Sequence, residues 1–450
     1  MPATPIQRSK NLPDAYVRFG AEIAAWTRDA MAEFGGHEPS DVHDQATYTT
    51  SWAPYALATG DADVRRFMLD LRDRIAVHFE TNGQWRHGYW RMQEAHHGTE
   101  HFELFLGALS DMAPGDTATA KQLDDAAEHL GNWSNEVPDW YDWDRHLYRS
   151  MWFGTDGLKH EDRAALNVPD HLRCVNIALL AYRATSDERY LQLSVAYAGR
   201  WADAILARPE LPVGLDADGG VYALEGEARE SYRKVAGMAF SSEGKGLDSE
   251  LDRAENFLAS GVIKTFLELF ERTQEERFLR AAERLLDELA TQVSDPDAGA
   301  ALADLRRYRR VTGRTRYDAA LRSAAAALDP ASIQELQLET PPKVDVRPAG
   351  IGKRADMPRW LENGRPRRHA PVLLGLVAEM DGNEQWAREA LDLGRAYLSL
   401  ARQQFPHGRH HGCAARTISA VARGHGRDNH AGVITEVYAP LGSSFKLTDR

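Results

Sequence analysis

Hydrophobic and polar positions recur along this chain with a helical period, and the same two-helix pattern returns several times. In residues 175–206 an almost wholly apolar helix is followed by a tight polar turn and then by an amphipathic helix. A helix that is apolar all round is expected to be buried, and a helix with one apolar stripe is expected to face water. The other copies of this pattern are 47–71, 99–130, 262–289, 302–328 and 371–398.

Six such pairs predict an all-α fold of the (α/α)6-toroid type, with six inner and six outer helices and no separate β domain. No alternating apolar and polar run is long enough to predict a β-sandwich. We expect one domain over 1–450, with 1–40 as an N-terminal lead-in and 404–450 as the segment that closes the ring. The inner helices are predicted near 47–58, 100–110, 172–184, 257–270, 302–310 and 370–380.

The connections between pairs are much longer than the turns within pairs. Because short and long connections alternate, the long ones are expected on one face, where the inner helices begin. Long ordered loops in a compact domain are usually functional. The site is therefore predicted on that face, in loops that run approximately through 80–98, 132–170, 207–250, 329–368 and 404–428.

Six polar stretches are interpreted as entries to inner helices, and histidines occur in five of them. They are His43, His97 with His101, His171, His369 and His430. His97, Glu100 and His101 stand at i, i+3 and i+4, which is one face of a helix. Helix capping accounts for Asp170, but it does not account for the histidines. One cavity is predicted to bring together His97, His101, His171, His369 and His430. There Glu100 stays ionised and stabilises the charged form of His97 or His101.

Charge narrows the choice of partner. The formal net charge of −13 argues against a nucleic-acid partner, because phosphate binding needs a basic surface. No apolar run approaches the roughly 18 residues of a membrane span, and the first residues lack the apolar stretch of a signal peptide. These features predict a cytoplasmic protein with no membrane partner, unless an export signal has been trimmed. Two basic loops, 343–369 and 402–430, favour an anionic substrate.

Aromatic residues and a short histidine motif add two further expectations. Trp140, Tyr141 and Trp143 lie in one long loop, and flat aromatic faces suit sugar rings, although core packing is the competing interpretation. Residues 97–101 match the H-x-x-E-H pattern of inverted zinc proteases, but that pattern needs an α/β context. We therefore expect no cofactor, with a divalent metal at His97 and His101 as the alternative.

With these features the chain resembles carbohydrate-active enzymes with the (α/α) toroid: polysaccharide lyases, unsaturated glucuronyl hydrolases and sugar 2-epimerases. The resemblance covers about 40–430 and is one of architecture, because the chain carries no family-specific catalytic motif. It implies an enzyme that acts on saccharides.

Within this group the residues favour a lyase that cleaves a uronic-acid-containing glycan by β-elimination. That reaction needs a base, an acid and a group that neutralises the carboxylate. His97 or His101 is expected as base or acid with Glu100 orienting them, and Tyr141 is an alternative base. The candidate catalytic residues are His97, Glu100, His101, Tyr141 and His171. The candidate substrate-binding residues are Arg173, His369, Asn429, His430, Trp140 and Trp143.

Three alternatives stay open. A glycoside hydrolase would need two carboxylates flanking the scissile bond. A sugar epimerase would use a histidine pair, and a non-catalytic helical scaffold would bind a partner without chemistry. The carboxylates eligible for hydrolysis are Glu100, Asp142, Asp144, Asp252, Glu255 and Glu436.

Overall fold

The computed structural model describes residues 4–35, 38–39, 46, 49–159, 165–222, 249–294, 301–328, 335–336, 370–404 and 433–448. Helices make up 68% of the structure. The chain divides into two compact units, and each is described by itself: unit 1 is Met1–Leu71 with Ala290–Arg450, and unit 2 is Arg72–Leu289. The expectation of one domain over 1–450 stays a prediction.

Six helix pairs occur in the described residues, in the order that the hydrophobic pattern predicts. Three of them are α3 (Ala53–Thr59) with α4 (Ala62–Thr81), α5 (Ala95–Glu100), η1 (His101–Leu106) and α6 (Gly107–Met112) with α7 (Thr117–Leu130), and α8 (Leu172–Thr185) with α9 (Glu188–Ala207). The other three are α12 (Val262–Thr273) with α13 (Glu276–Ala290), α14 (Leu302–Thr312) with α15 (Asp318–Leu328), and α17 (Ala370–Asp381) with α18 (Glu384–Gln404). The predicted all-α class is confirmed.

Most of the short turns within the pairs share one backbone conformation. In five of these six described pairs, a residue with positive φ follows the first helix. This left-handed residue ends the helix and turns the chain back. The five residues are Gly60, Ser186, Gln274, Gly313 and Gly382.

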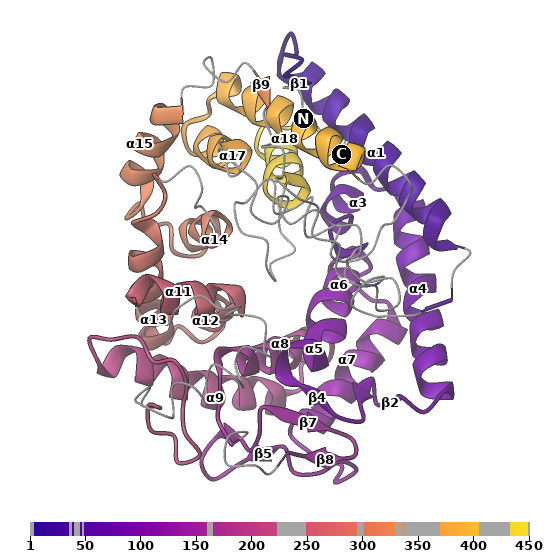
Figure 1. Ribbon diagram of the computed structural model, residues 1–450, viewed down its shortest axis with the longest axis vertical. Coiled ribbons are helices and arrows are strands. Elements are labelled where there is room, and N and C mark those ends of the chain that lie inside the picture. Colours follow the sequence, from indigo (N-terminus) through magenta and orange to yellow (C-terminus); the bar gives the residue numbers. More distant parts are fainter. Residues whose placement is uncertain are drawn as a thin grey trace. The chain divides into compact units, whose positions relative to one another are not determined.

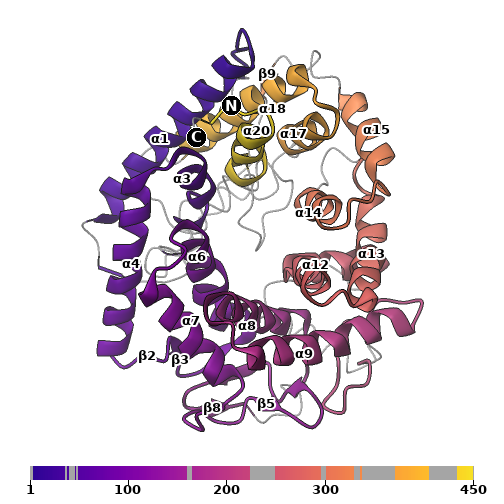
Figure 2. The same ribbon diagram turned by 180° about the vertical axis from the view of Figure 1, so that it is seen from behind.

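In unit 1 the two ends of the chain pack together. Helix α1 (Leu12–Gly35) lies along α18, and the C-terminal segments η4 (Val433–Tyr438) and α20 (Ala439–Ser444) pack against α3 (Figures 1 and 2). The Tyr16 and Tyr438 rings stack with their centroids 4.3 Å apart. Strand β1 (Thr4–Pro5) also pairs with β9 (Glu335–Leu336). This packing joins the lead-in helix to the described part of the predicted closing segment.

In unit 2 helix α8 is the central element. It packs against α7 and α9, and it also contacts α5 and α12. Every residue from Leu172 to Ala181 is buried, as the apolar pattern of this segment predicts. The helix that precedes α12, α11 (Glu250–Ala259), is separate from it because Gly261 has φ +71. The predicted inner helix near 257–270 therefore begins at Val262.

Short strands lie in the described parts of the connections before α5 and before η2 (Pro169–His171). The strands are β2 (Trp85–Arg86) with β3 (Tyr89–Trp90), β4 (Gln93–Glu94) with β7 (Trp152–Gly154) and β8 (Gly157–Leu158), and β5 (Tyr141–Asp142) with β6 (Leu147–Tyr148). The β4–β7 pairing holds Glu94 opposite Trp152, directly before α5. None of the helices in the described ranges is long and apolar enough to cross a membrane.

Candidate active site

Polar side chains from three helix starts of unit 2 meet in one buried cluster. His96 and Glu100 belong to α5, and Asp170 belongs to the short 3-10 helix η2 (Pro169–His171) that leads into α8. Ser260, from the turn between α11 and α12, donates its hydroxyl to the Asp170 carboxylate at 2.8 Å. We refer to Glu94, His96, His97, Glu100, Asp170 and Arg173 as the helix-start cluster.

Glu94 ties the start of α5 to His97. It is the N-cap of α5, and its carboxylate accepts the backbone N–H of His97 at 3.1 Å. A carboxylate at this position also complements the positive end of the helix dipole. The same carboxylate contacts Nδ1 of the His97 ring. The His97 side chain is 27% exposed, whereas that of Glu94 is 3% exposed, so His97 is the member of this pair that a ligand can reach.

His96 lies between two carboxylates. Its Nε2 is 3.2 Å from Oε1 of Glu100, and its Nδ1 is 3.5 Å from Oδ1 of Asp170. Burial raises the pKa of Asp170, but contacts with His96, Arg173 and Ser260 outweigh it and leave the pKa below its ordinary value. A polar atom of each of His96, His97 and Glu100 lies within 4.8 Å of the other two. The cluster thus joins two imidazoles to three carboxylates, which suits proton transfer.

A second polar layer extends the cluster toward α12. Glu103 accepts a hydrogen bond from Nδ2 of Asn176 at 3.1 Å, and it lies 3.9 Å from both Arg173 and Lys264. Asn176 accepts in turn from the Thr265 hydroxyl at 2.8 Å. Glu103 sits in the π-helical segment η1, a distortion that is frequent at functional sites. Lys264 is 45% exposed, so it brings a positive charge to the surface beside the cluster.

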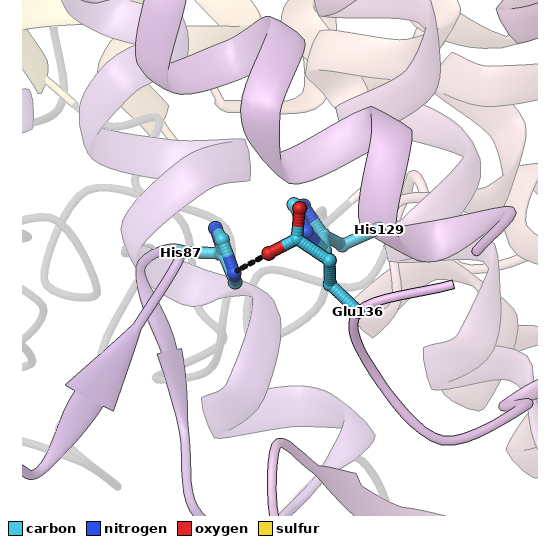
Figure 3. Close-up of side chains that lie close together, drawn as sticks. All are labelled: His87, His129 and Glu136. Atoms are coloured by element: carbon cyan, nitrogen blue, oxygen red, sulfur yellow. Dashed lines mark ion pairs between the residues drawn. The ribbon is translucent and has the colours of Figure 1, made fainter. Parts of the chain in front are cut away.

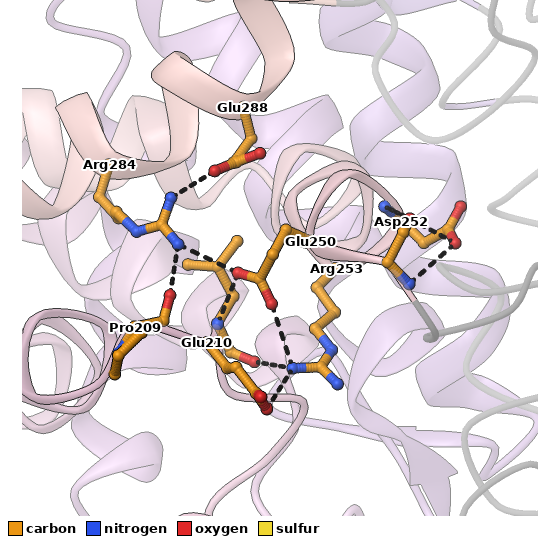
Figure 4. Close-up of polar contacts among 9 residues, drawn as sticks. Pro209, Glu210, Glu250, Asp252, Arg253, Arg284 and Glu288 are labelled. Atoms are coloured by element: carbon orange, nitrogen blue, oxygen red, sulfur yellow. Dashed lines mark hydrogen bonds and ion pairs between the residues drawn. The ribbon is translucent and has the colours of Figure 1, made fainter.

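The charged residues at the start of α11 form ion pairs and a helix cap. Figure 4 shows Glu250 next to Arg253 and Arg284, with Asp252 at the beginning of the helix. Asp252 and Ser249 form a reciprocal capping box. Asp252 is one of the carboxylates eligible for hydrolysis, and in the structure it belongs to the cap of α11.

Three sequence-predicted residues lie in the cluster: His97, Glu100 and Arg173. Their contacts differ from the expected ones, because Glu94 holds His97 while Glu100 contacts His96. Arg173 is only 1% exposed and faces Glu103 and Asp170. The positive charge of Arg173 is thus balanced by carboxylates of the protein itself.

Of the two histidines considered for the charged form, His97 and His101, His101 does not fit that role. His101 is buried, with its ring 4.7 Å from Trp85 and 5.8 Å from Phe105. Burial lowers the pKa of His101 to about 3, and the Gln122 side chain offsets this only in part. One turn of helix thus separates an imidazole among carboxylates from one among aromatic rings.

His171 is a second correction. Its Nε2 lies 3.0 Å from the carbonyl oxygen of Ser150, and the backbone N–H of Val168 donates to its Nδ1 at 3.1 Å. The ring is fully buried and burial lowers its pKa. Both nitrogens contact the backbone, so His171 fixes the turn before α8 and has no nitrogen left for a substrate.

The aromatic residues of the 132–170 loop divide into core and surface. Trp140 is fully buried and donates its Nε1–H to the carbonyl of Gly154 at 3.1 Å, so no face remains for a sugar ring. Burial raises the pKa of Tyr141, whose hydroxyl contacts His146, and this opposes a role as base. Trp143 is 41% exposed, which leaves its predicted stacking role open.

The remaining predicted residues are not members of the described cluster. His43, His369, Asn429 and His430 lie outside the described residues. Glu436 belongs to unit 1, and Asp142 is held by Arg145 and Arg149 on the β5–β6 hairpin.

Sequence reasoning missed Glu94, His96, Asp170 and Lys264 as members of the site or its border. One signal for Glu94 was present, since it stands three residues before His97 at a helix start, which is the N-cap to N3 spacing. Asp170 was assigned to capping, whereas its side chain contacts His96 and Ser260. Only tertiary packing brings α5, η2 and α11 together.

Comparisons with known proteins give structural likenesses alone. No protein-family model matches the chain, and no curated protein does. An unsaturated glucuronyl hydrolase specific for heparin is similar at 12% identity and a TM-score of 0.45, over 70% of this chain and 81% of that one. A D-mannose isomerase is similar at 12% identity and 0.43, over 66% and 83%. A sugar epimerase from a ruminal bacterium is similar at 11% identity and 0.41, over 71% and 77%.

The three proteins are a hydrolase, an isomerase and an epimerase that act on sugars, and all three are similar to this chain only at low identity. Similarity this distant carries no information about the reaction.

Proposed function

We propose that this chain is a carbohydrate-active enzyme whose helix-start cluster transfers a proton on an anionic saccharide. We rank first a lyase that cleaves a uronic-acid-containing glycan by β-elimination. The observation that carries the proposal is the setting of His97: an exposed imidazole whose Nδ1 is held by the buried Glu94 carboxylate, beside His96 and Glu100. A carboxylate that orients an imidazole in this way prepares its other nitrogen to act as a base.

In this mechanism His97 takes the proton from C5 of the uronate. The electron pair of that C–H bond forms a double bond between C4 and C5, and the bond from C4 to the glycosidic oxygen breaks. His97 then passes the proton to the departing oxygen, so the products are an unsaturated uronate and a free hydroxyl group. Glu94 and Glu100 stabilise the charged imidazole between the two transfers.

The substrate carboxylate needs a positive neighbour, because removal of the C5 proton places negative charge beside it. Lys264 is exposed, and the Glu103 side chain bridges it to Arg173. The basic segments 343–369 and 402–430 would add to the attraction of an anionic substrate. We therefore assign Lys264, rather than the buried Arg173, to the substrate carboxylate.

A glycoside hydrolase is the second candidate, and one observation favours it. Glu100 and Asp170 contact the two nitrogens of the same His96 ring, so two carboxylates stand near one another. Hydrolysis requires two carboxyl groups around the scissile bond. Because Asp170 is fully buried whereas His97 has exposed surface, we rank this function below the lyase.

The test is a panel of uronic-acid glycans incubated with the full chain in deuterated buffer. A lyase produces the ultraviolet absorbance of the unsaturated uronate. New reducing ends without that absorbance would indicate a hydrolase and contradict the lyase. Deuterium in an uncleaved sugar would indicate an epimerase, which also abstracts a proton from carbon. No product and no deuterium on any glycan would contradict the proposal as a whole.

The variant His97→Gln tests whether an observed activity depends on the helix-start cluster. Its matched control is His78→Gln, the same substitution in the same unit on α4, outside the cluster. We expect turnover of the His97 variant to fall by roughly 10²–10⁴-fold, with the control at wild-type turnover. Equal turnover of both variants would move the active site elsewhere.

A further inference from the structure

A second histidine cluster lies elsewhere in unit 2, between the β2–β3 hairpin and the C-terminal end of α7. Figure 3 shows His87 and His129 facing one another, with Glu136 beside them. A nitrogen of each histidine and a carboxylate oxygen of Glu136 lie within 4.8 Å of one another. We refer to His87, Asp125, His129 and Glu136 as the hairpin cluster. The function proposed above makes no use of it.

Asp125 fixes which nitrogen of each ring carries the proton. The backbone carbonyl of Asp125 lies 2.6 Å from Nδ1 of His129, and its carboxylate lies 3.2 Å from Nδ1 of His87. Both oxygens can only accept, so each Nδ1 carries a hydrogen that it donates. In a neutral imidazole this leaves the lone pair on Nε2. Both rings are thus held in the tautomer that binds a metal through Nε2.

The two Nε2 atoms are buried and have no hydrogen-bond partner in the described part of the chain. The His129 side chain is 3% exposed, and Nε2 of His87 lies 3.4 Å from the Glu136 carboxylate. A buried nitrogen without a partner is costly unless something binds it. Two such nitrogens, one of them 3.4 Å from a carboxylate, point to a cation.

We propose that the hairpin cluster binds one zinc ion through Nε2 of His87, Nε2 of His129 and the Glu136 carboxylate. Two imidazoles and a carboxylate are an established donor set for Zn²⁺, with water in the fourth position. Glu136 is 50% exposed, which leaves room for that water. The contacts from Asp125 to both Nδ1 atoms are the outer-sphere support that orients metal-binding histidines.

Binding requires a small rearrangement of the rings. They stack with centroids 3.6 Å apart and 21° between their planes. A tetrahedral ion at ordinary Zn–N distances would separate the centroids to about 5 Å. His87 lies at the tip of a hairpin and Glu136 is exposed, so these two residues can open around the more rigid His129.

The backbone at His87 is a second, independent indication. His87 and Gly88 are the two loop residues of the β2–β3 hairpin, with φ of +58 and +75. This turn type strongly prefers Asn-Gly, and histidine is one of the few other side chains that the left-handed region tolerates. A histidine that persists where asparagine fits better suggests a function for the side chain.

The turn supplies the decisive variant. His87→Asn places the preferred residue in the turn and removes the imidazole, so loss of zinc cannot be attributed to a damaged hairpin. Apo full-length protein, stripped with a chelator, is titrated with Zn²⁺ against a chromophoric competitor. We expect wild type to bind one ion, and His87→Asn and His129→Gln to bind it roughly 100-fold or more weakly. Asp125→Asn should weaken binding by roughly 10–100-fold.

Two controls complete the experiment. His78→Gln should bind zinc as wild type does, since His78 lies outside the cluster on α4. Glu100→Gln tests the other histidine group, formed by His96, His97 and Glu100. The proposal is overturned if wild type binds no stoichiometric zinc, if His87→Asn binds it as tightly as wild type, or if only Glu100→Gln loses it.

Discussion

Unit 2 contains two pairs of neighbouring histidines, and their surroundings assign them different chemistry. In the helix-start cluster His96 and His97 are surrounded by three carboxylates, and one ring reaches solvent. In the hairpin cluster each ring donates Nδ1–H to Asp125. Both Nε2 atoms are buried, and that of His87 lies 3.4 Å from the Glu136 carboxylate. An imidazole among carboxylates exchanges protons, whereas two neighbouring imidazoles with their Nε2 lone pairs available bind a cation.

Their positions in the fold differ as well. The helix-start cluster lies where α5, η2 and α11 bring polar side chains together, whereas the hairpin cluster lies at the end of the outer helix α7. Trp85 of the β2–β3 hairpin packs on His101, at the end of α5. Changes that abolish turnover are therefore expected in the first cluster, and changes that leave turnover unaltered are expected in the second.

The largest effect is expected from Glu94→Gln. The amide can still accept at the helix N-cap, but it no longer carries the charge that orients and stabilises the His97 ring. We expect turnover to fall by roughly 10²–10⁴-fold, with at most about 1–2 kcal/mol lost from the free energy of unfolding.

Asp187→Asn is the matched control for that substitution, since Asp187 caps α9 in the same unit. It should cost a similar amount of stability and leave turnover unchanged. Equal losses of turnover in the two variants would mean that the Glu94 effect is one of folding.

The second prediction concerns pH and His101. Its pKa is about 3 in the folded protein and 6.5 ordinarily, so the unfolded chain binds a proton that the folded chain does not. Stability is therefore full above pH 6.5 and falls as the pH is lowered toward 3, by at most about 5 kcal/mol from this group. In His101→Phe that loss should disappear, while stability at neutral pH changes by less than about 1.5 kcal/mol. Chemical denaturation of both proteins at several pH values measures it, and parallel pH profiles would contradict the burial argument.

The third prediction concerns Asp170. Asp170→Asn removes a buried carboxylate that contacts His96 and Arg173. We expect the free energy of unfolding at neutral pH to fall by about 3 kcal/mol. Because the pKa of Asp170 is lowered from 3.8, the wild-type advantage should be complete above pH 4 and shrink as the pH falls below that value. Denaturation of the two proteins between pH 7 and pH 3 checks this, and an advantage that grows in acid would contradict it.

Features of the fold and the site could be predicted where they depend on residues close together in the sequence. The helix pairs follow from apolar periodicity and from turn residues such as Gly60 and Gly313, which act within a few positions. His97 and Glu100 were found because they share a helix. Glu94 and Asp170 meet α5 through strand pairing and tertiary packing, which a linear pattern does not encode.

The histidines with other roles show the same limit. His101 and His171 were chosen by position, but neighbouring aromatic rings and backbone groups determine their ionisation. Nothing in the linear order indicates that His87, His129 and Glu136 meet. Residue type and spacing predicted the neighbourhood of the site, and three-dimensional contacts determine what each imidazole does.

The smallest effect is expected at the hairpin cluster. A chelator should lower the thermal unfolding midpoint of zinc-loaded wild type by a few degrees, because a ligand bound only to the folded state stabilises it. The midpoint of His87→Asn should not respond to the chelator, and its turnover should match wild type. An equal shift in both proteins would place the responding metal elsewhere.

The central claim is that His97, oriented by Glu94, is the residue that transfers the proton. The most direct measurement is turnover and melting of His97→Ala against wild type, on the glycan that gives the unsaturated product. Because His97 is partly exposed at a helix N-terminus, we expect turnover to fall by roughly 10²–10⁴-fold while the melting midpoint stays nearly unchanged. Full turnover in His97→Ala, or a loss of activity that only follows a lowered melting midpoint, would contradict the account.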